Sequence, residues 1–306
     1  MAIKTKIKIY GLTLIELLIV IFIMSLVTGA IYTVFKKQYW SSTRESNIII
    51  AQENAQTILE IIRQDLMMAG WGLQNIDCSL YIEDGGNGNP DKLYINYWNL
   101  LDENDAWNGY FSDITFLGSG SSSITLSTFD LDNDGTIDFT TNMYIITNAN
   151  SNKVAKISSL DSSNHTLNLS TNVDGSYLTP AIYYCLNCGG AGNDYILRRS
   201  DRNSGGLQPL AENIVDFQIA YSDRNGTWYC DGSANCPMSP FETKNISLVR
   251  VTVIARTKAL GAMRGSSRIV QAENGNTWGT TNDGFVYRAY SITIAPKHLK
   301  LFRLNP

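Results

Sequence analysis

The sequence is short of histidine, charge and proline, and each shortage excludes a class of protein or structure. Its 306 residues include only two histidines, His165 and His298, which fall in an ordinary strand-like context and near the C-terminus. A histidine-based triad or a zinc enzyme is therefore not expected. The net charge of −4 argues against a broad nucleic-acid-binding surface. The sequence thus predicts neither an enzyme nor a nucleic-acid-binding protein.

Charge is scarcest between Leu12 and Phe35, where Lys, Arg and Asp are absent and Glu16 carries the single charge. As a helix this stretch would be about 36 Å long, which is enough to cross a lipid bilayer. Three lysines precede it, at Lys4, Lys6 and Lys8. This positive charge predicts a cytoplasmic N-terminus, with everything after Phe35 outside the cytoplasm. Hydrocarbon tolerates an ionised carboxylate badly, so Glu16 requires a specific role.

The basic start, Gly11, the apolar run and Glu16 together resemble the type III leader of type IV pilins and their relatives. The resemblance implies that a membrane enzyme, the prepilin peptidase, cuts between Gly11 and Leu12 and that the new amino terminus is methylated. It further implies that Glu16, the fifth residue of the mature chain, pairs with the free amine of a neighbouring subunit during filament assembly. Leu12 replaces the phenylalanine that is usual at this position, which is a conservative apolar change.

A cut after Gly11 would keep the apolar stretch on the mature protein, whereas an ordinary secretory signal loses its apolar region. The alternative is a simple signal anchor with an incidental glutamate, but the spacing of lysines, glycine and glutamate favours the pilin leader. Cleavage would leave 306 − 11 = 295 residues. That length allows one long helix and one sizeable globular head.

Proline is absent between Leu12 and Ala69, which predicts one continuous helix of about 85 Å. Gly70 and Gly72, on either side of Trp71, are expected to end it. Its second half carries an apolar stripe at helical spacing, formed by Ala51, Ala55, Ile58, Ile62, Leu66 and Ala69. We expect this stripe to pack against the head and the first half to lie in the membrane or the filament core.

The predicted fold is α+β, with the long N-terminal helix packed on an antiparallel, β-rich head. It divides into a leader at 1–11, a transmembrane helix at 12–35, an amphipathic helix at 36–72 and a globular head at 73–306. In the head, short β-branched or aromatic runs alternate with Gly, Asn, Asp and Ser. The expected strands are Lys92–Trp98, Ser123–Phe129, Asp138–Thr147, Lys153–Ser158, His165–Leu169, Tyr195–Ser200, Asn213–Tyr221, Leu248–Thr257 and Phe285–Ala295. Alternation in the eighth of these predicts a strand with one exposed face.

The helix end from Arg63 to Gly72 resembles that of the PilW group of minor pilins, in which an Arg, an Asp-Leu and an Ala-Gly-aromatic follow in this order. Two later segments, Leu210–Tyr221 and Val286–Pro296, resemble strands of the same group. The resemblance implies a minor pilin in the initiating or tip complex of a type IV pilus. Its partners would be other minor and major pilins, or a tip adhesin. It would lie in the inner membrane, with its head in the periplasm, before it reaches the cell surface.

The leader and the helix leave two alternatives open. A pseudopilin of a type II secretion machine would share both features, although Glu16 argues against the pseudopilin class that usually lacks this residue. A surface adhesin or enzyme that uses pilin export is the other alternative, with a sugar groove lined by aromatic residues. Core packing is the commoner role of such aromatics. The candidates for a groove are Trp98, Trp107, Trp228 and Trp278.

The acidic segment from Phe129 to Phe139 predicts a calcium-binding loop between β-strands. Carboxylates at loop positions one, three and five, a glycine at six and a carboxylate at nine suit a hard cation with oxygen ligands. The expected ligands are Asp130, Asp132, Asp134, the carbonyl of Thr136, and Asp138, with Gly135 at the turn. Position twelve is Thr141, not the glutamate of an EF-hand. The alternative is a solvated acidic turn without metal, but mutual repulsion of the aspartates favours calcium. A second acidic stretch, 84–91, is expected to be a flexible loop.

Five cysteines occur, and an oxidising compartment outside the cytoplasm favours disulfides. We expect two local bridges, Cys185–Cys188 and Cys230–Cys236. Cross-pairing of the four cysteines and a four-cysteine zinc site stay open, because sequence alone does not decide connectivity. Cys78 is the odd thiol, either buried or paired with another chain.

Overall fold

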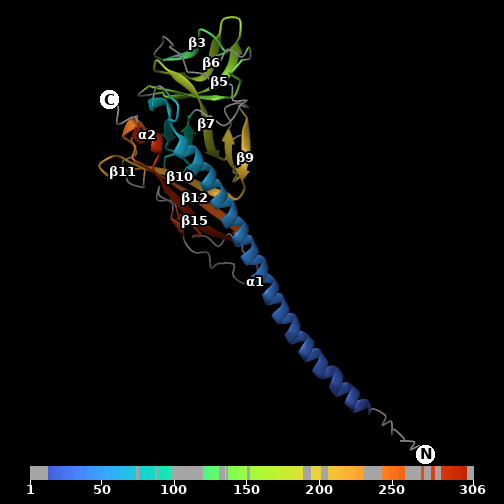
Figure 1. The fold of residues 1–306 in the computed structure, drawn as a ribbon. Helices are drawn as coiled ribbons and strands as arrows, with labels where there is room; N and C mark the ends of the chain where they lie inside the picture. The colour runs from blue at the N-terminus through green and yellow to red at the C-terminus, as the bar shows by residue number, and fades with distance from the viewer. Residues whose placement is uncertain are drawn as a thin grey trace, which may run out of the picture.

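The computed structural model describes residues 13–73, 76–86, 89–97, 120–130, 135, 137–149, 152–188, 194–200, 206–230, 243–258, 270–271, 277–279 and 284–301. Within these residues, one long helix protrudes from a β-rich head (Figure 1). The strands of the head pair antiparallel, and the second half of the helix packs against them. The predicted α+β fold is therefore confirmed.

Helix α1 (Leu14–Met68) is continuous over 55 residues. Its end is set by Gly70, which has a φ of +82°. This backbone conformation favours glycine, and a Cβ atom there would lie 2.5 Å from Cδ1 of Ile76, so the Ile76 side chain would have to shift. The amide of Gly70 donates a 2.9 Å hydrogen bond to the carbonyl of Asn96, which ties the helix end to the head.

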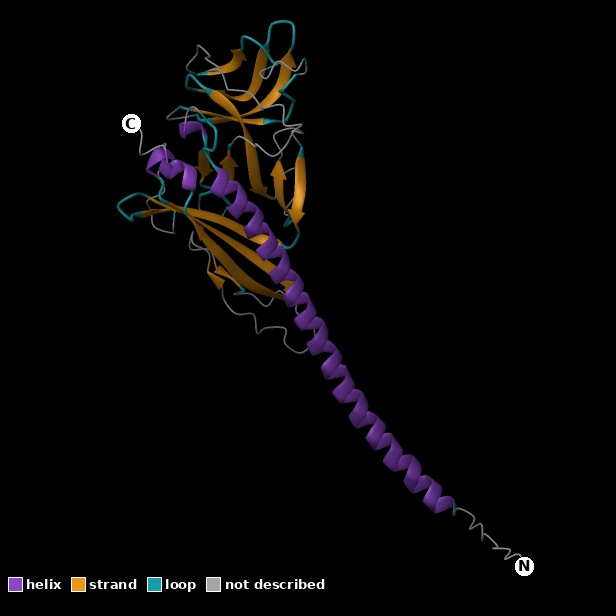
Figure 2. Ribbon diagram, in the orientation of Figure 1, coloured by secondary structure: helices purple, strands orange, loops and turns teal. Residues whose placement is uncertain are grey.

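The two halves of α1 differ in burial, and Figure 2 shows the first half standing clear of the strands. In the second half, Ala55, Ile58, Leu59, Ile62, Asp65 and Leu66 are buried against the head. Ala51 is partly buried beside the same core and Ala69 is fully buried. The apolar stripe predicted from helical spacing is thus the face that packs on the sheets.

Among the described residues, nine strands form the larger sheet, in the order β1-β2-β7-β4-β5-β6-β3, with β8 pairing both β7 and β9. Their bounds are β1 (Leu80–Glu83), β2 (Lys92–Ile95), β3 (Ser121–Thr125), β4 (Tyr144–Thr147), β5 (Val154–Asp161), β6 (Thr166–Val173), β7 (Leu178–Leu186), β8 (Leu197–Ser200) and β9 (Leu207–Ala211). All nine residues of β7 are buried, which makes this strand the centre of the sheet.

A second sheet of four described strands lies beneath α1, in the order β11-β10-β12-β15. Its strands are β10 (Ile214–Ser222), β11 (Trp228–Tyr229), β12 (Leu248–Lys258) and β15 (Phe285–Ile294). Smaller elements are the hairpin β13 (Val270–Gln271) with β14 (Thr277–Trp278), the helix α2 (Lys297–Leu301) and 3-10 turns at Ile76–Cys78 and Thr243–Asn245. Val249, Val251 and Val253 of β12 point into the core shared with α1.

Two expectations about strands are wrong in detail. The opposite face of β12 is not exposed, because Thr252 and Ile254 are buried and Ile254 packs in a separate small core with Val215 and Tyr287. The strand expected from Asp138 begins only at Tyr144, because the chain first turns at Asn142, whose φ is +73°. The strands β1 and β9 were not expected from the sequence.

Candidate functional site

The first described turn of α1 is closed by Thr13 and Glu16. The backbone N–H and the hydroxyl of Thr13 both donate to Oε2 of Glu16, at 2.9 and 3.0 Å, and the N–H of Glu16 donates back to the Thr13 hydroxyl at 3.3 Å. This reciprocal capping box satisfies helix-end donors and holds the carboxylate at the positive end of the helix dipole. The predicted cleavage residues, Gly11 and Leu12, lie outside the described residues.

The apolar half of α1, from Leu14 to Phe35, is bare, meaning that no described part of the protein covers it. From Leu14 to Phe35 its large apolar side chains are between 47% and 79% exposed. Among the described residues, α1 is the one helix that is long and apolar enough to cross a membrane, and none of its apolar window is buried. Each such side chain gains about 1.5–3 kcal/mol when it leaves water. This half of the helix therefore requires lipid or other protein chains around it.

An aromatic and basic belt follows the apolar half. Tyr32 and Tyr39 are exposed, and Nζ of Lys36 lies 4.8 Å from the ring centroid of Trp40. Tyrosine, tryptophan and lysine are the residues that settle at the boundary between lipid and water. These residues lie around Phe35, the predicted end of the membrane span, which stays a prediction.

A buried ionic cluster locks the last turns of α1 to the larger sheet. Asp65, which is 5% exposed, accepts hydrogen bonds from the hydroxyls of Tyr97, at 2.7 Å, and Tyr184. Nε of Arg199 donates to Oδ2 of Asp65 at 3.1 Å and to the Tyr184 hydroxyl at 3.0 Å. Burial, and then the neighbouring Asp65 carboxylate, raise the pKa of Tyr184 well above its usual value. The cluster compensates a buried charge with three donors from β7, β8 and the segment after β2.

Sequence reasoning found only one member of this cluster. Asp65 belongs to the helix-end pattern that resembles the PilW group, and its partners were missed. Tyr97, Tyr184 and Arg199 lie 32, 119 and 134 positions away along the chain. No local pattern marks them, because each sits in an ordinary strand-like run.

The predicted calcium loop is described only in part. Asp130, Gly135 and Asp138 are described, whereas Asp132, Asp134 and Thr136 lie outside the described residues. The Asp138 amide donates to the carbonyl of Phe129 at 2.9 Å, which brings the two ends of the loop together. Gly135, with a φ of +89°, donates its amide to Oδ2 of Asp130 at 2.9 Å. Within the described ranges, no three His, Cys, Asp or Glu side chains converge as a metal site.

The stretch 84–91, expected to be a flexible loop, is held to the head at its last residue, Asp91. The backbone N–H and carboxylate of Asp91 engage β10, with Asp91 N donating to the Phe217 carbonyl at 2.8 Å and Ile219 N donating to Oδ2 at 2.7 Å. The amide of Gly85 donates to the other carboxylate oxygen at 3.0 Å. Burial raises the pKa of Asp91 to about 7, although the two amides oppose that shift. Asp91 thus fastens the edge of β10 to the larger sheet.

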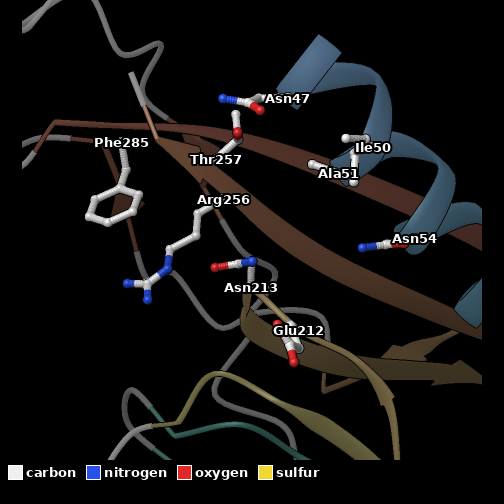
Figure 3. Close-up of a pocket in the computed structure, with 9 residues that line it drawn as sticks. All are labelled: Asn47, Ile50, Ala51, Asn54, Glu212, Asn213, Arg256, Thr257 and Phe285. Atoms are coloured by element: carbon white, nitrogen blue, oxygen red, sulfur yellow. The ribbon is translucent and has the colours of Figure 1, made fainter. Parts of the chain in front are cut away.

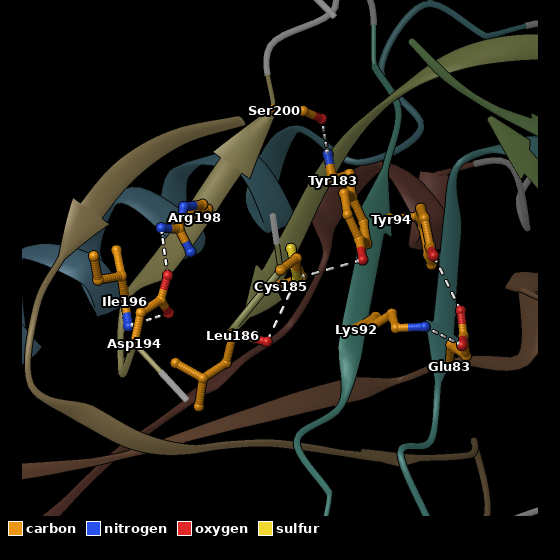
Figure 4. Close-up of a disulfide and its surroundings, with 11 residues drawn as sticks. Glu83, Lys92, Tyr94, Tyr183, Cys185, Leu186, Asp194, Ile196, Arg198 and Ser200 are labelled. Atoms are coloured by element: carbon orange, nitrogen blue, oxygen red, sulfur yellow. Dashed lines mark hydrogen bonds and ion pairs between the residues drawn. A yellow bond between two sulfur atoms is a disulfide. The ribbon is translucent and has the colours of Figure 1, made fainter. Parts of the chain in front are cut away.

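The structure contains a disulfide between Cys185 and Cys188, with Cα atoms 6.0 Å apart, and Figure 4 shows its surroundings at the end of β7. The hydroxyl of Tyr183 lies 3.7 Å from Sγ of Cys188. Cys230 is also disulfide-bonded, and Cys236, its expected partner, lies outside the described residues. Cys78 is free and buried, which is one of the two states expected for it, and burial raises its thiol pKa to about 12.

The tryptophans considered for a sugar groove have internal partners where they are described. Nε1 of Trp278 donates to Oδ2 of the buried Asp216 at 3.1 Å. The ring of Trp228 lies 4.4 Å below the guanidinium carbon of Arg250. Trp98 and Trp107 lie outside the described residues. Trp228 and Trp278 therefore both have partners within the head.

Comparison with known proteins finds a family match for the N-terminal segment of the chain. Residues 8–32 match the model of the prokaryotic N-terminal methylation motif, which implies processing by a prepilin peptidase. No curated protein matches the chain. Among solved structures, the chain is similar to a type IV-like pilin, TTHA1219 from Thermus thermophilus, at 10% identity and a TM-score of 0.39. That match covers 81% of this chain and 97% of the other.

The methylation motif covers the segment in which Thr13 and Glu16 cap a bare apolar helix, and the helix continues into an antiparallel β head. Inner-membrane anchoring by this helix, followed by incorporation into a filament, is consistent with the motif. Residues 8–32 of the chain thus carry the prokaryotic N-terminal methylation motif, in the segment that leads into a long apolar helix and a β-rich head.

Proposed function

We propose that the protein is a minor pilin of the PilW type, built into the initiating or tip complex that primes assembly of a type IV pilus. The observation that carries the proposal is the bare apolar half of α1, from Leu14 to Phe35, with Glu16 held at its start. Such a surface is stable in lipid and, after extraction, only among the apolar helices of other subunits. The carboxylate then supplies the charge that pairs with a neighbour's methylated amine.

The PilW assignment rests on the resemblance of the helix-end sequence. Asp65, Ala69 and Gly70 of the resembling pattern all perform specific structural tasks at the junction between helix and head. Trp71 packs edge-on against His298, with ring centroids 4.3 Å apart, which joins the same junction to α2. A pseudopilin of a type II secretion machine is the alternative, because it would share the leader and the helix.

A deletion strain tests the proposal. Surface pili are counted by electron microscopy and secreted proteins are compared, with complementation by wild type, Glu16→Ala and Glu53→Ala. Loss of pili with normal secretion supports the minor pilin, and Glu16→Ala is expected not to restore them. Glu53→Ala is the matched control, because Glu53 is an exposed glutamate on the same helix outside the apolar half. Normal pili with lost secretion would assign the protein to the secretion machine.

We further propose that the loop at 130–138 binds calcium. The described part fits this role, because the Phe129–Asp138 hydrogen bond closes the loop and Gly135 provides the sharp turn at position six. Asp130 and Asp138 would then contribute carboxylate oxygens from the two ends of the loop, with Asp132, Asp134 and the Thr136 carbonyl as the remaining ligands. Calcium would neutralise the acidic turn and fix the segment between β3 and β4.

A further inference from the structure

A cavity of about 350 Å³ lies where α1 leaves the head. Figure 3 shows Asn47, Ile50 and Asn54 of α1 on one side and Asn213, Arg256 and Phe285 of the head on the other. The lining is mixed, with amide groups beside apolar side chains and one guanidinium. The α1 residues that line it lie at the start of the helix segment that packs against the head.

Aromatic rings fix the position of the Arg256 side chain, but its hydrogen-bond donors have no acceptor within the described part of the head. Its guanidinium carbon lies 3.5 Å from the ring centroid of Tyr195 and 4.5 Å from that of Phe285. These π contacts attract the cation without using its N–H groups in directed hydrogen bonds. Among the described residues the guanidinium makes no hydrogen bond or ion pair, and its buried Nε has no partner. Glu212 lines the same cavity and makes no ion pair with it.

The chemistry of Arg256 selects the ligand group. A guanidinium presents five N–H donors in a planar fork and no acceptor, a geometry that matches a carboxylate. Because its nearest ring contacts restrict it, little side-chain entropy remains to be lost when a partner binds. Asn54 and Asn213 add amide groups for a backbone or side chain next to the carboxylate, and Ile50 and Phe285 add apolar contact.

Lipid headgroups do not reach this cavity when α1 stands upright. Ile50 lies 15 residues beyond Phe35, which is about 22 Å along the helix. The headgroup layer is only about 5–8 Å thick beyond the hydrocarbon. This distance excludes a lipid headgroup as the partner of Arg256 and favours a protein carboxylate.

The bare half of α1 indicates which chain this is. Helices of neighbouring subunits that cover it would lie about 8–10 Å away and would run alongside α1 toward the head. Beyond the polar segment that follows Phe35, Ile49 and Ile50 are 53% and 52% exposed and form a second apolar patch beside the cavity. A neighbour's helix that contacts this patch brings its side chains to Arg256.

We propose that the cavity receives a carboxylate side chain from helix α1 of a neighbouring pilin-like subunit, with Arg256 as its partner. The inference rests on the proposed function, because it requires assembly with other subunits. It adds a second electrostatic contact between subunits, on the water side of the membrane and far along the helix from Glu16.

In vivo photocrosslinking of the full chain tests the inference. A photoreactive residue is placed either at Asn54, in the cavity, or at Leu26, in the bare half of α1. We expect both probes to crosslink to another pilin-like subunit. The peptide captured at Asn54 should come from the partner's N-terminal helix and contain Asp or Glu. Arg256→Gln should lower the Asn54 crosslink about tenfold, equivalent to about 1.4 kcal/mol, and leave the Leu26 crosslink unchanged.

The matched control is Arg250→Gln, another arginine of β12 that lies over an aromatic ring, which should change neither crosslink. Arg256→Lys keeps the charge without the planar fork and should give an intermediate yield, which covers the case in which Arg256→Gln does not fold. A Leu26 crosslink without an Asn54 crosslink would overturn the inference and leave the proposed function standing. Capture of lipid or of a neighbour's head at Asn54, or an unchanged yield in Arg256→Gln, would overturn it too. Absence of both crosslinks would refute the proposed function itself.

Discussion

The hydroxyl of Tyr97 donates a 2.7 Å hydrogen bond to the carboxylate of Asp65, which joins the last turns of α1 to the segment that follows β2. Tyr184 and Arg199 complete the contacts of this carboxylate. Since the anchor lies at one end of α1 and the head at the other, this cluster is a main connection between them.

Asp65→Asn is expected to lower the free energy of unfolding by about 3 kcal/mol, because it leaves the mostly covered Arg199 without its counter-charge. Chemical denaturation of the full chain in detergent measures the loss. The control is Glu60→Gln, which breaks an ion pair to Arg63 whose side chains are 48% and 38% exposed and should cost less than about 1 kcal/mol. Equal effects of the two substitutions would contradict the role of the Asp65 cluster.

Gly70→Ala is expected to destabilise the helix end more than Gly226→Ala, although both glycines have a φ of +82°. The backbone strain is therefore matched, at about 1 kcal/mol. Only at Gly70 would the new methyl group meet another side chain, Cδ1 of Ile76 at 2.5 Å, whereas nothing lies within 4 Å at Gly226. Urea denaturation should show the difference, and equal losses would rule out the close packing at Gly70.

Asp91 should make stability depend on pH. Its pKa is raised from 3.8 to about 7, first by burial, so the folded protein binds this proton more tightly than the unfolded chain. Stability from this group is therefore greatest below about pH 4, falls as pH rises to about 7, and is constant above. Melting of Asp91→Asn across this range should show a flatter profile, while Asp161→Asn, at an exposed aspartate whose pKa is lowered, should not flatten it.

Calcium should raise the melting temperature and a chelator should lower it. Binding at a concentration 100 times the dissociation constant stabilises a protein by about 2.7 kcal/mol. Asp130→Asn is expected to weaken the response to calcium. Asp161→Asn removes another aspartate that accepts hydrogen bonds in an exposed turn and should leave the response intact. No shift at millimolar calcium would exclude the site.

The sequence was most informative where one physical requirement dominates. The long apolar run without proline dictates α1, and the helical spacing of Ala55, Ile58 and Ile62 identifies the face that packs on the head. Strand β7 was harder to predict because it is buried on both faces and shows no alternation, and because Pro180 within it argues against a central strand.

The partners of functional side chains could not be predicted at all. Asp65 meets Arg199 across 134 positions, and Arg256 meets Tyr195 across 256 − 195 = 61 positions. These contacts follow from the packing of the two sheets around α1, which local residue patterns do not encode. The leader pattern, in contrast, is local, and it was sufficient to indicate a pilin-like protein.

Because α1 is one continuous helix, a change in its tilt displaces the head at its far end. Transmembrane helices tilt by about 20° on average, and a rigid helix of 55 residues is about 82 Å long. Such a tilt moves the far end sideways by about 28 Å, and the Asp65 cluster carries the head with it. In the proposed membrane-anchored state, the head would therefore range over a wide area above the membrane, which would enlarge the area in which it can meet other subunits.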